Sequence, residues 1–92
     1  MLITIVLDYA GGTYLSQVEV QDPSELPSRL VDAVNWESLS PSPLPSMVSK
    51  YIESVAKSSV GEMSGLKQVW CMSGMIGGEL ALIHAVNTVV AE

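Results

Sequence analysis

The sequence predicts a two-layer α+β domain of order β-β-α-α-β-β, in which a four-stranded antiparallel sheet carries two helices on one face. Two apolar segments each contain a Gly-Gly pair typical of a hairpin turn, and two apolar stripes of helical period lie between them. An isolated hairpin is marginally stable in water, so both hairpins are expected to join in one sheet. Residues 1–92 are expected to form a single domain.

The first hairpin is expected over Leu2 to Gln21, with a two-residue turn at Gly11-Gly12. A type I′ turn needs positive φ at both central positions, which glycine adopts without steric cost. This turn places Ile5 opposite Val18. The same face of the hairpin is then expected to carry Ile3, Ile5, Leu7, Tyr9, Tyr14, Ser16, Val18 and Val20.

The first helix is expected from about Ser24 to Asn35, with Asp22 or Ser24 as its N-cap and Pro27 in its first turn. Trp36 is expected to cover the edge of the core. The apolar stripe of this helix consists of Leu26, Leu30, Val31 and Val34.

Residues Ser38 to Ser46 include three prolines and four serines, which is typical of an extended connector. Their PxPxP spacing could suit an SH3-like groove, but the flanking basic residue of such ligands is missing, so a plain linker is favoured. In the second helix, Glu53 and Lys57 are expected to pair at i, i+4 on the polar side. Its apolar stripe consists of Met47, Val48, Tyr51, Ile52 and Val55.

After a loop from Ser58 to Gly65, a second hairpin is expected: Leu66 to Ser73, a turn region centred on Met75 to Gly78, and Leu80 to Val90. A helix is the rival interpretation for Glu79 to Val90. The polar residues of that segment scatter around a helical wheel, and its β-branched residues favour a strand.

The net charge is −6, spread along the chain without a run of like charge, and no apolar run of about 18 residues occurs. Such an acidic surface repels phosphate backbones and anionic lipids, so neither nucleic acid nor a membrane is an expected partner. The acidity is typical of a solubilising surface; attraction to a basic partner is the alternative. A single cysteine and the lack of a signal pattern favour the cytoplasm.

More apolar side chains are expected on the sheet than two short helices can cover, which predicts a homodimer or another obligate protein partner. The contact surface is expected at the uncovered sheet face or at the edge strand of the late hairpin. The candidate contact residues are Leu15, Trp70, Met72, Ile76 and Ile83.

Cys71 and His84 are the weak candidates for chemistry, because a two-residue turn at Gly77-Gly78 places them directly opposite each other. They could act as nucleophile and base, or as two ligands of a soft metal. Zinc requires three or four ligands, and a reactive thiol requires cationic surroundings. The expected neighbours are instead Val69, Ser73, Leu82 and Val86, so a buried, inert cysteine is favoured.

No other catalytic, cofactor or metal site is expected. Asp8 is interpreted as a solvated strand-end carboxylate that helps to define the turn. The glycine pairs lack the spacing of phosphate-binding loops, and no metal-binding or nucleophile motif occurs.

The segment Asp8 to Val18, with Val69-Trp70-Cys71 near the end, resembles a small family of uncharacterised bacterial proteins that share a DYxGGTYxSQ hairpin and a late VWC strand. The resemblance covers both hairpins and implies strands there, without an activity. The chain is also similar in outline to the HicB antitoxin domain, where a glycine-containing hairpin precedes a helix; its second helix and late hairpin depart from that pattern.

These features favour a small non-catalytic, self-associating binding module of the cytoplasm. An antitoxin-like inhibitor of a basic enzyme is one alternative. A thiol-dependent enzyme or sensor that uses Cys71 and His84 is the other.

Overall fold

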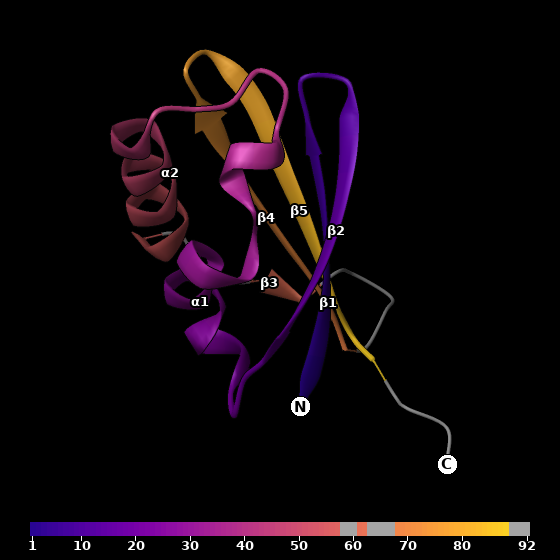
Figure 1. The fold of residues 1–92 in the computed structure, drawn as a ribbon. Coiled ribbons are helices and arrows are strands. Elements are labelled where there is room, and N and C mark those ends of the chain that lie inside the picture. Colours follow the sequence, from indigo (N-terminus) through magenta and orange to yellow (C-terminus); the bar gives the residue numbers. More distant parts are fainter. Residues whose placement is uncertain (58–60, 63–67, 89–92) are drawn as a thin grey trace.

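The computed structural model describes residues 1–57, 61–62 and 68–88 (Figure 1). The elements, in chain order, are β1 (Leu2–Tyr9), β2 (Gly12–Glu19), the 3-10 turn η1 (Pro23–Glu25), α1 (Leu26–Ala33), the 3-10 turn η2 (Trp36–Ser38), α2 (Pro45–Lys57), β3 (Gly61–Glu62), β4 (Val69–Ile76) and β5 (Glu79–Asn87). One antiparallel sheet has the order β2-β1-β5-β4-β3, and both helices pack on the same face of it (Figure 1). The predicted α+β class and its four long strands are confirmed.

The two-residue strand β3 lies inside the segment that was predicted as a loop. It pairs with Trp70 and Cys71 on the outer side of β4, so the edge of the late hairpin is partly covered. Leu66, Lys67 and the end of the last predicted strand fall outside the described residues. Within the described ranges, no helix combines the length and the apolarity needed to cross a membrane.

The turn of the first hairpin lies one residue earlier than predicted. Ala10 and Gly11 are its central residues, with φ of 49° and 83°, and Tyr9 pairs with Gly12. The predicted register is therefore wrong by two residues: Ile5 lies opposite Ser16, not Val18. A shift of two keeps every side chain on its face, so the predicted apolar face is correct.

Gly12 is needed for a close approach and not for the turn. A Cβ atom at this position would lie 2.9 Å from the hydroxyl oxygen of Tyr14 and about as close to its ring carbons. The second glycine of the pair therefore makes room for the Tyr14 ring. Ala10 accepts the positive φ that a type I′ turn requires.

The first helical region begins with a capping box. The Asp22 carboxylate accepts a hydrogen bond from the Ser24 amide at 2.9 Å, and the Glu25 carboxylate accepts one from the Asp22 amide at 2.8 Å. Regular α-helix then runs only from Leu26 to Ala33, shorter than predicted. At its end the Leu30 carbonyl accepts two hydrogen bonds, one from the Val34 amide at 3.3 Å and one from the Trp36 indole at 3.1 Å, which fixes Trp36 at the end of the helix.

The capping box is expected to make stability pH-dependent. Hydrogen bonds from backbone amides lower the pKa of Asp22 from its ordinary 3.8 and that of Glu25 from its ordinary 4.5. Their stabilisation is therefore complete above those values and is lost as the pH falls through the lower folded values. The double variant Asp22→Ala, Glu25→Ala should melt at a lower temperature than the wild type at neutral pH, with the gap closing on acidification. Parallel melting curves over that range would contradict this.

Tyr51 of α2 is the largest fully buried side chain among the described residues. It is fully buried, its ring meets the Trp36 ring edge-on at 6.2 Å, and its hydroxyl donates to the Ala81 carbonyl at 3.1 Å. Burial raises the pKa of Tyr51, so the hydroxyl remains protonated as a donor. On the outer side of α2, Glu53 and Lys57 form the predicted pair at 3.4 Å.

The late hairpin turns at Gly77 and Gly78, with φ of 57° and 86°, and β5 is a strand and not a helix, as predicted. One prediction about this hairpin is wrong. Four of the five candidate contact residues face the helices and are buried in the core, because β1 pairs with β5 so that Leu7 lies beside Ile83. The four are Trp70, Met72, Ile76 and Ile83.

Candidate functional site

The open face is defined here as the sheet face turned away from α1 and α2 (Figure 1). Three large apolar side chains on it are strongly exposed: Leu15 at 72%, Met75 at 57% and Leu80 at 57%. Other apolar residues of this face are half-buried, namely Leu2, Val6, Val69, Leu82 and Val86. Of the candidate contact residues, only Leu15 lies here.

Charged side chains are scarce on the open face. Among the described strand residues it carries Asp8 and Glu19, both on the first hairpin and both exposed. The described basic side chains, Arg29, Lys50 and Lys57, belong to the two helices. The middle of the open face therefore carries no carboxylate, lysine or arginine side chain, and charged residues are likewise depleted in the cores of protein interfaces.

One cross-strand row contains the two candidates for chemistry. Leu15 pairs with Val6, Val6 pairs with His84, and His84 pairs with Cys71. The predicted opposition of Cys71 and His84 is thus confirmed. The expectation that Cys71 is buried is wrong, because the residue lies on the open face at intermediate exposure.

The surroundings of Cys71 are as the sequence indicated. Ser73 pairs with Leu82, and Val69 pairs with Val86, so these four residues flank the Cys71–His84 row on the same face. None of these four residues carries a positive charge, whereas a nucleophilic thiol of low pKa requires positive charge nearby. Within the described part of one chain, no group of three or more His, Cys, Asp or Glu residues could hold a metal ion.

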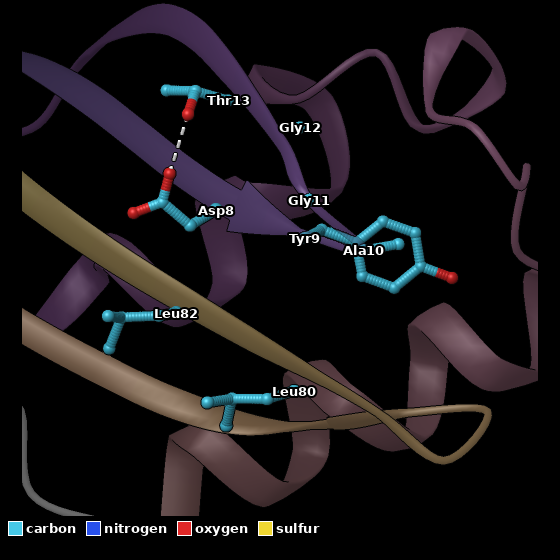
Figure 2. Close-up of a pocket in the computed structure, with 8 residues that line it drawn as sticks. All are labelled: Asp8, Tyr9, Ala10, Gly11, Gly12, Thr13, Leu80 and Leu82. Carbon is cyan, nitrogen blue, oxygen red and sulfur yellow. Dashed lines mark hydrogen bonds between the residues drawn. The ribbon is translucent and has the colours of Figure 1, made fainter.

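A hollow of about 300 Å³ opens beside the first turn (Figure 2). Residues 8–13 form one side of it, and Leu80 and Leu82 form the other. The exposed Asp8 carboxylate accepts a hydrogen bond from the Thr13 hydroxyl at 2.7 Å, across the β1–β2 pair (Figure 2). This is the strand-end role predicted for Asp8. The hollow has one carboxylate and two leucines, which is an apolar depression with a polar corner and not a catalytic constellation.

Polar side chains also lie toward the other end of the first hairpin. Gln17 donates from its amide to the Thr4 hydroxyl at 3.1 Å, and the hydroxyls of Thr4 and Thr88 hydrogen-bond to each other. Together with Asp8 and Thr13, these groups give the first-hairpin side of the open face a polar rim. Protein interfaces commonly have this anatomy.

Sequence reasoning missed most of the open-face residues on the second hairpin, including Val69, Leu80, Leu82 and Val86. Turn parity correctly grouped Val69, Leu82 and Val86 with Cys71 and His84, but it could not say which side of the hairpin faces the helices. Comparisons with protein-family models, with curated proteins and with solved structures find no match to this chain.

Proposed function

We propose that the chain is a small non-catalytic binding module of the cytoplasm that self-associates through its open face. The observation that carries the proposal is the exposure of Leu15, Met75 and Leu80 on one face, whose described strands carry no lysine or arginine and only two carboxylates. Several large apolar side chains exposed on one face commonly mark a protein contact surface.

The size of the face suits a dimer. Its four long strands have eight or nine residues each. With strands about 4.8 Å apart and a rise of about 3.3 Å per residue, the face covers about 500 Å² in plan. Two such faces in contact bury at least about 1,000 Å², which is the lower limit for a specific interface.

The charge distribution favours a second copy over a basic enzyme. A basic partner would be recognised by a cluster of carboxylates, whereas the open face has only Asp8 and Glu19 among its described strand residues, both toward one side. The net charge of −6 would oppose self-association if it lay within the contact. Only two of the ten acidic residues, Asp8 and Glu19, lie on the described strands of the open face, and both are on the first hairpin, so the other two long strands can meet a second copy with little like-charge repulsion.

The double variant Leu15→Glu, Leu80→Glu is expected to be monomeric under conditions where the wild type is dimeric. Both side chains are exposed in the single chain, so folding tolerates the change, whereas a face-to-face dimer would bury four unpaired carboxylates. Light scattering coupled to size exclusion measures the mass.

The matched control is Val31→Glu, because Val31 is also apolar and 55% exposed but lies on α1, away from the open face. This variant should remain dimeric. A wild type that is monomeric at every accessible concentration, or a double variant that associates as strongly as the wild type, would overturn the proposal.

A further inference from the structure

We propose that Cys71 and His84 of two copies together form a four-ligand site for a soft divalent cation of the zinc type. The inference rests on the proposed dimer and deepens it, because each copy supplies half of the site. The ligand set would be two thiolates and two imidazoles, a common tetrahedral zinc combination.

The geometry begins with the cross-strand pair in one chain. Cys71 and His84 are register partners on adjacent strands and point to the same, open face. Directly opposed residues have Cβ atoms about 4.5–5.5 Å apart, a separation from which a thiol and an imidazole can reach one ion. The described part of one chain supplies no third ligand, so a single copy would hold the ion incompletely.

A two-fold axis between facing sheets supplies the other two ligands. Stacked sheets lie about 10 Å apart, with their inner side chains meeting near the mid-plane. The Cys71–His84 row also includes Val6 and Leu15, so it crosses the middle of the open face. A self-complementary contact around this row would bring the two pairs together.

The charges of such a site balance in an apolar interface. Each thiol releases its proton to solvent on binding, and two thiolates then neutralise the two positive charges of the ion. The neighbours Val69, Leu82 and Val86 are apolar, and a neutral site is the form that they tolerate best. With all four positions occupied by protein ligands, the ion would stabilise the dimer and would have no open position for catalysis.

The test uses Co²⁺ as a spectroscopic substitute for zinc, added to the full chain under reducing conditions. We expect one Co²⁺ per two chains, with thiolate-to-cobalt charge transfer and the intense visible absorption of tetrahedral cobalt. Added Zn²⁺ should displace it. Cys71→Ser should remove the charge-transfer band and weaken binding by more than about 100-fold, beyond the ~10–100-fold cost of losing an outer-shell partner.

The matched control relocates the thiol along the same strand. In the double variant Cys71→Ser, Ser73→Cys, the composition of β4 is unchanged, but the thiol now lies opposite Leu82 and not His84. This variant should lose cobalt binding as Cys71→Ser does. Circular dichroism shows that each variant is folded.

The outcomes separate this inference from the proposed function. A wild-type dimer that binds no cobalt, binds one per chain, or binds it equally well after the thiol is relocated overturns the metal site and leaves the dimer standing. A chain that is monomeric with and without metal overturns both. One thiolate-ligated cobalt per dimer, lost in both variants, supports both.

Discussion

Replacing Tyr51 with alanine is expected to reduce the free energy of unfolding by about 3–5 kcal/mol, the range for truncating a large buried aromatic side chain. The ring is fully buried between Trp36 and the sheet. It also fills the space above Gly74, where an added Cβ would lie 3.1 Å from two ring carbons. Removing the ring leaves a cavity that Gly74 has no side chain to fill.

The conservative variant Tyr51→Phe separates the ring from its hydroxyl. It keeps the packing and loses only the hydrogen bond to the Ala81 carbonyl, so a loss of about 0.5–1.5 kcal/mol is expected. Urea denaturation, followed by tryptophan fluorescence and by circular dichroism, measures both. Equal costs for the two variants would show that the ring is not the main packing element between helix and sheet.

Ile83→Ala is expected to destabilise the fold by about 2–5 kcal/mol, whereas Leu82→Ala should cost about 1 kcal/mol in the dilute monomer. The two residues are neighbours in β5 and point to opposite faces: Ile83 is fully buried beneath the helices, and Leu82 is half-buried on the open face.

In self-association the order of the two effects should be reversed, with Leu82→Ala having the larger effect. Leu82→Ala removes apolar area from the proposed contact and should weaken the dimer, while Ile83→Ala should leave the surface of the folded molecules unchanged. Chemical denaturation of dilute protein gives the first quantity, and sedimentation equilibrium gives the second. A larger stability loss for Leu82→Ala would mean that the assignment of the two faces is reversed.

The strands and their faces could be predicted because side-chain direction alternates strictly along a strand. The turn at Gly77-Gly78 fixed the pairing of Cys71 with His84 from parity and loop length alone. In the first hairpin the faces were also predicted correctly, because a register shift of two residues keeps each side chain on its face, although Ala10 and not Gly12 occupies the turn. The close approach of the Tyr14 ring to Gly12 is a contact between residues i and i+2 on one face of β2, which a rule for the two central turn residues does not contain.

The orientation of the late hairpin could not be predicted in this way. Both of its faces are apolar, so alternation groups Trp70 with Ile83 and Cys71 with His84 but does not say which group faces the helices. The deciding feature is long-range: β5 pairs with β1, so that Ala85 and Ile83 lie beside Ile5 and Leu7. The open face follows from that pairing.

The rate at which a thiol reagent labels Cys71, followed over a range of protein concentration with EDTA present, tests the central claim most directly. Cys71 is the single cysteine of the chain and lies at intermediate exposure on the open face. If two copies cover that face, labelling should slow as the concentration rises through the dimer dissociation constant, and Leu15→Glu, Leu80→Glu should label at the fast rate throughout. A wild-type rate that is independent of concentration while the protein is dimeric would place the contact elsewhere and contradict the account.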